Sequence, residues 1–293
     1  MTSVQQGTLR APGASIFYRS CGRGRPVLIL PGGAADADMV DPLRDALSDR
    51  YRVITFDRRG LSRSAVDPGG PAPTLQGHAA DAHHLLAELT DEPAYVFGAG
   101  LGGLIGLDLL ARHPGQVRLL VAHEAPTKDL LPDAAREAMA DAQQAMLAAL
   151  RREGVAAALK RSAELTGADP EDREPDVAGP AVGPQHDANM AFYLTHDLPQ
   201  LMAYRLDLPA LDVQARRIAP AAGQSSRRTL LHQCAQALAE ALERPLAEFP
   251  GGHTGWLLRP KAFAARLAET FARSEDADPR LGDGVRPRTD GRP

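Results

Sequence analysis

The sequence predicts an α/β domain with a mostly parallel central sheet, helices on both faces of the sheet, and a helical insertion. Strand-like and helix-like patterns alternate through the first half of the 293-residue chain. A helix-rich block then interrupts this alternation, which resumes toward the end of the chain. Alternating strands and helices are typical of parallel sheets, because each parallel connection crosses one face of the sheet.

The elements of the first half follow from the spacing of their apolar residues. The predicted strands are residues 15–20, 26–30, 51–56, 94–97 and 117–122. The predicted helices are residues 36–47, 75–89 and 101–112. We expect strands 26–30, 52–56, 94–97 and 117–122 to lie parallel in one sheet, following the right-handed crossover rule.

The second half contains the insertion and the rest of the core. Residues 133–167 and 187–213 have helical patterns, and an acidic, proline-rich loop at 168–185 separates them. Strands at 217–222 and 246–249 alternate with helices at 226–242 and 260–272. We divide the chain into a core (1–126 and 215–273), a helical lid (127–214) and a tail (274–293) whose charged composition predicts disorder. The lid is expected over the carboxyl ends of the strands, where such sheets bind ligands.

Composition excludes several classes of partner. The net charge of −4 comes from interspersed signs without a basic stripe, so we expect no nucleic-acid binding. The start of the chain lacks a leader pattern and no apolar stretch reaches about 20 residues, so we expect a cytoplasmic protein without a membrane span. The histidines lack metal-ligand spacing, and His78, His83 and His84 are expected to face solvent, so we predict no metal. Nothing indicates an oligomeric state.

Four motifs carry a resemblance to a known family. They follow predicted strands, at residues 28–33 (LILPGG), 56–64 (FDRRGLSRS), 96–103 (VFGAGLGG) and 249–253 (FPGGH). Each motif alone is weak, but their order and spacing extend over about residues 15–273. The sequence therefore resembles the α/β-hydrolase superfamily, and more closely its small-molecule hydrolases with a helical cap. This resemblance implies a small-molecule substrate or ligand.

Position 100 departs from the family pattern. The resemblance implies a serine nucleophile in a G-x-S-x-G turn, but the sequence has Gly100 between Gly98 and Gly102. Glycine adopts the strained backbone of such a turn readily, so folding should not suffer. Glycine has no side-chain oxygen, so no acyl-enzyme can form there. Gly100 thus marks a nucleophile position without a side chain, unless it is simply part of a tight turn.

The remaining site residues are also implied by the resemblance. His253 corresponds to the catalytic histidine and is the candidate general base. The usual acid is missing after strand 217–222, so Glu124 either orients His253 or serves as a structural carboxylate. The backbone N–H groups of Gly33 and Leu101 would form the oxyanion hole. The turn residues Asp57, Arg58 and Arg59 are expected to be an ion-paired scaffold.

A second fingerprint overlaps the first. Gly98, Gly100 and Gly103 also spell G-x-G-x-x-G, with an acid at Glu124, which is the pattern of dinucleotide-binding folds. Such a unit normally opens its domain, whereas here several hydrolase-like strands precede it. We therefore predict no NAD, NADP or FAD, and no other cofactor.

Three hypotheses of function remain. The first is an enzyme that keeps the pocket, the oxyanion hole and His253 but uses no serine. It would catalyse a lyase, cyclase or isomerase reaction, or hydrolysis by an activated water. By analogy with other proteins of this fold, we expect the reaction to belong to specialised metabolism. The second is an inactive homologue that binds a small hydrophobic molecule. The third is an esterase disabled by a Ser-to-Gly change.

Overall fold

The computed structural model describes residues 4–70, 72–178 and 184–277. The strands in these ranges form one nine-stranded sheet. The strand order is β1-β2-β4-β3-β6-β7-β8-β9, and β5 pairs with β2. The strands are β1 (Gln5–Ala11), β2 (Ala14–Cys21), β3 (Pro26–Leu30), β4 (Arg52–Phe56), β5 (Ala65–Val66), β6 (Ala94–Ala99), β7 (Val117–His123), β8 (Ile218–Gly223) and β9 (Ala247–Phe249). The pairs from β4 through β9 are parallel and those of β2 are antiparallel. The predicted mostly parallel sheet is confirmed.

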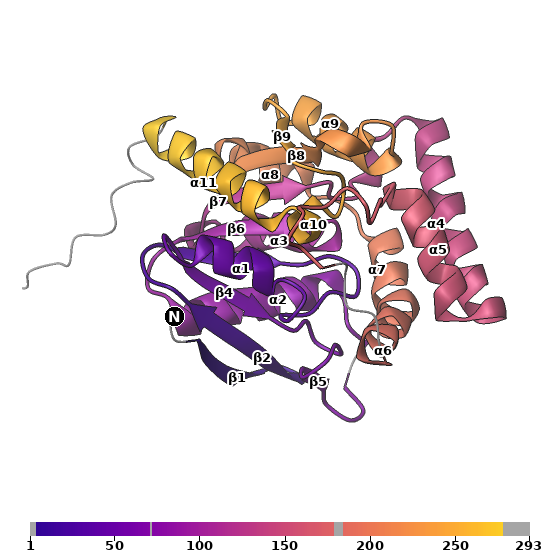
Figure 1. Ribbon diagram of the computed structural model, residues 1–293, viewed down its shortest axis with the longest axis horizontal. Helices are drawn as coiled ribbons and strands as arrows, with labels where there is room; N and C mark the ends of the chain where they lie inside the picture. Colours follow the sequence, from indigo (N-terminus) through magenta and orange to yellow (C-terminus); the bar gives the residue numbers. More distant parts are fainter. Residues whose placement is uncertain (1–3, 71, 179–183, 278–293) are drawn as a thin grey trace, which may run out of the picture.

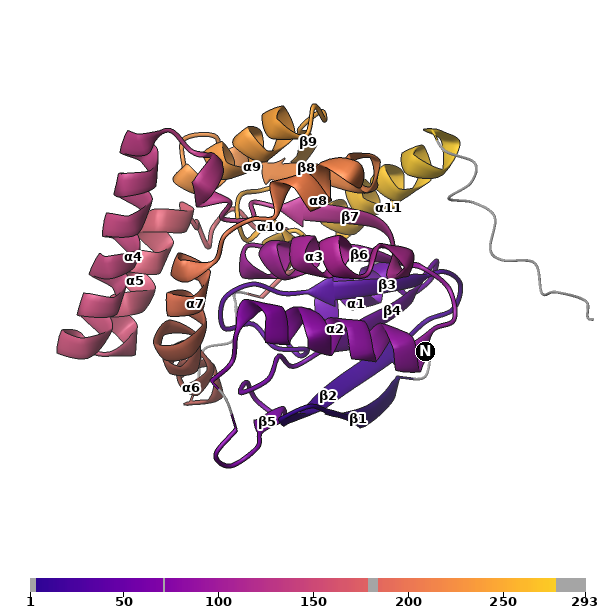
Figure 2. The same ribbon diagram turned by 180° about the vertical axis from the view of Figure 1, so that it is seen from behind.

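Helices cover both faces of this sheet, as predicted (Figures 1 and 2). One face carries α1 (Asp41–Leu47), α10 (Gly255–Leu258) and α11 (Pro260–Ala277), and the other carries α2 (Leu75–Leu89), α3 (Leu101–Arg112), α8 (Leu208–Val213) and α9 (Leu230–Ala241). The two faces have separate hydrophobic cores because side chains alternate along each strand. In β3, Val27 and Ile29 pack toward α1 and α11, whereas Leu28 and Leu30 pack toward α2 and α3.

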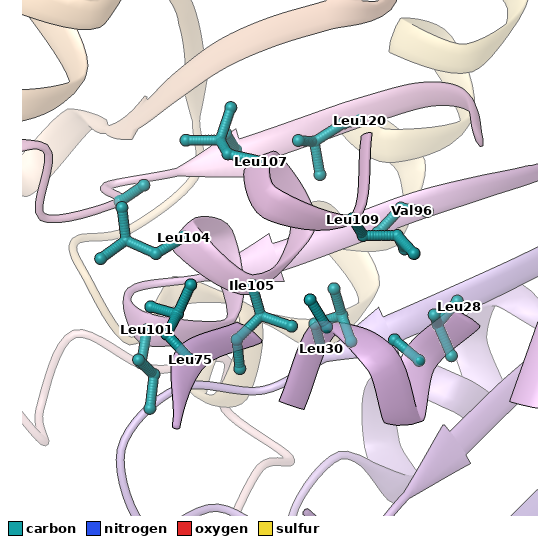
Figure 3. Close-up of a cluster of buried hydrophobic side chains, with 14 of the residues drawn as sticks. Leu28, Leu30, Leu75, Val96, Leu101, Leu104, Ile105, Leu107, Leu109 and Leu120 are labelled. Carbon is teal, nitrogen blue, oxygen red and sulfur yellow. The ribbon is translucent and has the colours of Figure 1, made fainter. Parts of the chain in front are cut away.

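Helix α3 anchors the centre of the second core. Its side chains Leu104, Ile105 and Leu109 pack with Leu30 of β3 and Leu120 of β7 (Figure 3). Full burial of each such side chain contributes roughly 1.5–3 kcal/mol. The helix is buried along its length, and it starts directly after β6, so the core fixes the position of the β6–α3 turn.

A group of four helices lies beside the core, on one side of both views (Figures 1 and 2). They are α4 (Asp133–Glu153), α5 (Val155–Thr166), α6 (Pro184–Phe192) and α7 (Leu198–Ala203). Helices α4 and α5 form a hairpin that turns at Gly154, where φ is +88°. A π-helical turn, Tyr193–Asp197, joins α6 to α7. Among the helices of the described ranges, none has the length and apolarity needed to cross a bilayer.

Some element boundaries differ from the predicted ones. Strand β1 was not predicted, because it is an edge strand with mostly exposed or half-buried residues. The helix predicted from residue 36 begins only at Asp41, since Asp36 accepts hydrogen bonds from the N–H groups of Asp38 and Met39 in a preceding turn. Helix α11 continues to Ala277, beyond its predicted end. The rest of the predicted tail, residues 278–293, lies outside the described residues.

Candidate active site

A cavity of about 250 Å³ lies at the carboxyl ends of the parallel strands. The core side of its lining includes Gly33 after β3, Gly100 after β6, Pro126 after β7 and His253 after β9. Side chains from α4, α5, α6 and α7 line the opposite side. Ligand sites of open α/β sheets occupy this same edge, because the loops that follow the strands converge there.

The β6–α3 turn brings Gly100 to the cavity with a special backbone. Gly100 has φ +53° and ψ −118°, a combination that residues with a side chain rarely adopt. The flanking glycines permit close packing: a Cβ at Gly102 would lie 1.9 Å from the carbonyl oxygen of Leu30, and a Cβ at Gly98 would lie 2.4 Å from that of Gly102. These two positions therefore exclude any larger residue. A Cβ at Gly100 would meet only the ring of His253.

His253 faces Gly100 directly. A Cβ on Gly100 would lie 3.2 Å from both Cε1 and Nε2 of the imidazole. A Cβ is only about 1.5 Å from its Cα, so Nε2 lies within about 5 Å of the Gly100 Cα. The other ring nitrogen, Nδ1, is 2.9 Å from Oε2 of Glu124. The structure thus brings together Gly100, His253 and Glu124, which are far apart in the sequence.

Glu124 is fully buried directly after β7 and has a φ of +46°. Strained backbone of this kind in a non-glycine residue clusters at functional sites. Its Oε1 accepts hydrogen bonds from the N–H of Gly223, at 2.9 Å, and from the hydroxyl of Ser226. Burial would raise the pKa of Glu124, but His253, the ring of His123 and Ser226 together lower it to about 2. Glu124 therefore forms a hydrogen bond with His253 and also accepts hydrogen bonds from the loop after β8. Both roles considered from the sequence, orienting His253 and serving as a structural carboxylate, thus have a geometric basis.

The charge on Glu124 fixes the tautomer of His253. An ionised carboxylate only accepts hydrogen bonds, so Nδ1 must carry the proton that it donates to Oε2. In the neutral imidazole, Nε2 then has a free lone pair, and this atom borders the space where a Cβ of residue 100 would lie. This is the arrangement that a general base requires.

Two backbone segments next to Gly100 can donate hydrogen bonds. Leu101 is the first residue of α3, and the first N–H groups of a helix have no intrahelical acceptor. The helix dipole also favours negative charge at this end. Gly33 lines the cavity with φ +54°, and nothing lies within 4 Å of where its Cβ would be. Both residues are therefore at the cavity surface beside Gly100.

The turn after β4 is ion-paired, as expected for Asp57, Arg58 and Arg59. Asp57 pairs with Arg63, and Arg59 pairs with Asp81 of α2. Arg58 is fully buried and pairs with Asp197 in the π-helical turn. Arg58 also donates to the carbonyl oxygen of Gly33, so it connects the loop after β3 to the helices across the cavity.

The expectation that His78 faces solvent is wrong. His78 is only 2% exposed, because Asp197 reaches across from the helical group, and His78 Nε2 lies 2.9 Å from Asp197 Oδ1. Burial opposes ionisation of Asp197, but Arg58 and His78 outweigh it and lower the pKa of Asp197 to about 2. Asp197 was missed in the sequence, where nothing marks a residue so distant from Arg58 as its partner.

The glycine motif has a structural use that differs from cofactor binding. Glu124, which would bind a ribose in the dinucleotide interpretation, bonds His253 instead. A Cβ at Gly103 would lie 2.7 Å from the Cβ of Ala125, so this glycine permits α3 to pack closely. Within the described part of the chain, no three His, Cys, Asp or Glu side chains are grouped so as to hold a metal ion.

Comparisons with known proteins agree with this fold. The sequence profile of the α/β hydrolase fold family matches residues 25–176. An uncharacterised hydrolase of Bacillus subtilis, YraK, is 35% identical over 278 residues, which cover 93% of this chain and 98% of that protein. An esterase of Thermogutta terrifontis has a similar fold, with a TM-score of 0.69 at 18% identity over 92% of this chain and 99% of its own. A haloalkane dehalogenase variant of Bradyrhizobium elkanii has a TM-score of 0.65 at 20% identity, over 95% of this chain and 99% of its own.

Proposed function

Because the chain belongs to the α/β-hydrolase fold family, we propose that it hydrolyses small apolar esters by direct attack of water, with His253 as the general base. One observation carries the proposal: His253, held by Glu124, has its Nε2 next to a turn residue that has no side chain. In this interpretation the turn is a nucleophile elbow in which G-x-S-x-G has become G-x-G-x-G. The space of the missing hydroxymethyl group is where a water would attack.

The reaction follows from the positions of these groups. A water bound between Nε2 of His253 and the ester carbonyl gives its proton to Nε2 as its oxygen bonds to the carbonyl carbon. The negative charge that develops on the carbonyl oxygen is stabilised by the N–H groups of Gly33 and Leu101. The intermediate collapses by cleaving the bond to the alcohol oxygen, which takes the proton back from the imidazolium. The products are a carboxylic acid and an alcohol, and Glu124 pairs with the imidazolium in between.

Residues 127–214 would act as the lid of this site. Their helices supply the far side of the cavity lining, with Met139, Met146 and Met190 among the contributors. An apolar lid limits the water near the carbonyl, which strengthens the hydrogen bonds made by the oxyanion donors. The esterase of similar fold acts on esters, which supports the same class of substrate here.

The test compares the wild type with Gly100→Ser and its matched control Gly100→Ala on p-nitrophenyl butyrate. Both variants add a Cβ at the strained turn, at a cost of about 1–3 kcal/mol, but only serine adds a nucleophile. We expect the wild type to hydrolyse the ester without any covalent adduct in intact-protein mass spectrometry. Gly100→Ser should show a burst and a butyryl adduct, and Gly100→Ala should show neither. A butyryl adduct on the wild type would contradict the proposal.

The cavity also favours a second candidate, a protein that binds a small hydrophobic molecule without converting it. The observation behind it is the apolar lining, in which Leu198, Leu201, Leu231 and Trp256 accompany the methionines. Wild-type protein that binds apolar esters but hydrolyses none of a panel of them would favour this candidate. The same base and hydrogen-bond donors also suit proton-transfer chemistry. An enzyme of that kind would likewise hydrolyse none of the esters in the panel.

A further inference from the structure

Gln143, a polar residue of the cavity lining, lacks a partner for its amide oxygen. Gln143 lies on α4 between Met139 and Met146, one turn away on either side, and all three line the cavity. The Gln143 residue is only 3% exposed, and its Oε1 is buried without a hydrogen-bond partner. The two methionines form the apolar face of α4, so the helical period places a polar group where the pattern calls for another apolar residue.

A buried amide oxygen without a partner destabilises a protein, and native structures rarely contain one. Replacement of Gln143 by an apolar residue would remove this cost without leaving a hole, because methionine has a similar length. The retention of an amide in this position is therefore explained best if a ligand completes its hydrogen bonds. Met190 and Leu201, which also line the cavity from the helical side, are apolar and compete for no such bond.

We propose that Gln143 is a specificity residue, which binds a hydroxyl group on the apolar part of the substrate. A hydroxyl group can both donate to Oε1 and accept from the amide N–H₂, so it gives the buried oxygen the partner that it lacks. The ligand is then a small carbonyl compound with an apolar chain that carries one hydroxyl group. The carbonyl group in this description rests on the proposed function, whereas the recognition of the hydroxyl group does not.

Binding of ketones tests this inference without any turnover. The probes are 2-nonanone and its positional series of derivatives with one hydroxyl group at C5, C6, C7, C8 or C9, which are ketones and cannot be hydrolysed. Trp256 is the one tryptophan of the chain and lines the cavity, so its fluorescence reports occupancy. We expect the wild type to bind at least one hydroxylated derivative about fivefold more tightly than 2-nonanone, the usual scale of one net hydrogen bond.

Gln143→Met should abolish this preference, while it binds 2-nonanone at least as tightly as the wild type and unfolds at the same or a higher temperature. The matched control, Ser162→Ala, changes another polar residue of the lining and should keep the preference. The inference is overturned if the wild type binds none of these ketones, if it prefers no hydroxylated derivative, or if Gln143→Met retains the preference. Lack of ester turnover would count against the proposed function alone, because these affinities do not depend on it.

Discussion

Glu124→Gln should remove the general base while leaving the shape of the site intact. The N–H of Gly223 and the hydroxyl of Ser226 both donate to Oε1, so the amide oxygen of a glutamine must occupy that position. The amide N–H₂ then faces His253 Nδ1, where Oε2 now lies 2.9 Å away. Nδ1 must accept this hydrogen bond, so the ring proton moves to Nε2. A protonated Nε2 cannot take a proton from water.

The size of the effect follows from the loss of general-base catalysis, which contributes about 10²–10⁴-fold. We expect kcat/KM for p-nitrophenyl butyrate to fall at least about 100-fold, equal to about 2.7 kcal/mol of transition-state stabilisation. KM should change little, because the cavity lining does not include Glu124. The fold should persist, since the two donors to Oε1 keep their acceptor.

Steady-state hydrolysis, with stability measured in parallel, checks this prediction. The matched control is Ser226→Ala, which removes one donor to Oε1 but keeps the carboxylate beside His253. Its kcat/KM should fall less than about tenfold, as expected for one net hydrogen bond. A Glu124→Gln protein that is folded and as active as the wild type would refute the tautomer argument.

Two further predictions concern the buried ionisable residues His123 and Arg58. Burial lowers the pKa of His123 to about 4, so its contribution to stability is full above the unfolded value of about 6.5 and is lost as the pH falls toward 4. In urea unfolding, the free energy of unfolding of the wild type should fall by up to about 3 kcal/mol more than that of His123→Leu between pH 7.5 and 4.5. An equal loss in both proteins would contradict this. Arg58→Met should lower the free energy of unfolding by about 3–5 kcal/mol, because it leaves the buried Asp197 without its arginine partner and with His78 alone. The same change should cost at least about 1 kcal/mol less in an Asp197→Asn background. Equal costs in the two backgrounds would argue against direct pairing.

Much of the fold could be predicted because its signals are local. Strand 26–30 and helices 75–89 and 101–112 have the predicted bounds, since each ends at a clear change of pattern. Thr74, for example, caps the second of these segments by accepting from the N–H of Gly77. The position of His253 and Gly100 at one edge of the sheet also follows from sequence, because both come directly after strands.

The missed features depend on contacts between distant segments. Nothing around Asp197 indicates that Arg58 and His78 meet it, and the helical pattern of residues 187–213 does not reveal a π-helical turn. Gln143 lies within an alanine-rich helix whose pattern does not show which face borders a cavity. Ser226 likewise lies in a short turn, and its bond to Glu124 exists only because β7 and β8 are neighbours in the sheet. Sequence alone therefore indicated that Gly100, Glu124 and His253 lie together, but not the residues that surround them.

The most direct test of the account is the kcat/KM of His253→Ala on p-nitrophenyl butyrate, measured beside His84→Ala. His84 lies on α2 and does not line the cavity, so its removal should leave the rate unchanged. If His253 is the base that activates water at Gly100, its removal should lower kcat/KM by at least about 100-fold. A His253→Ala protein that keeps most of the wild-type rate would contradict the account, because the chemistry would then occur elsewhere.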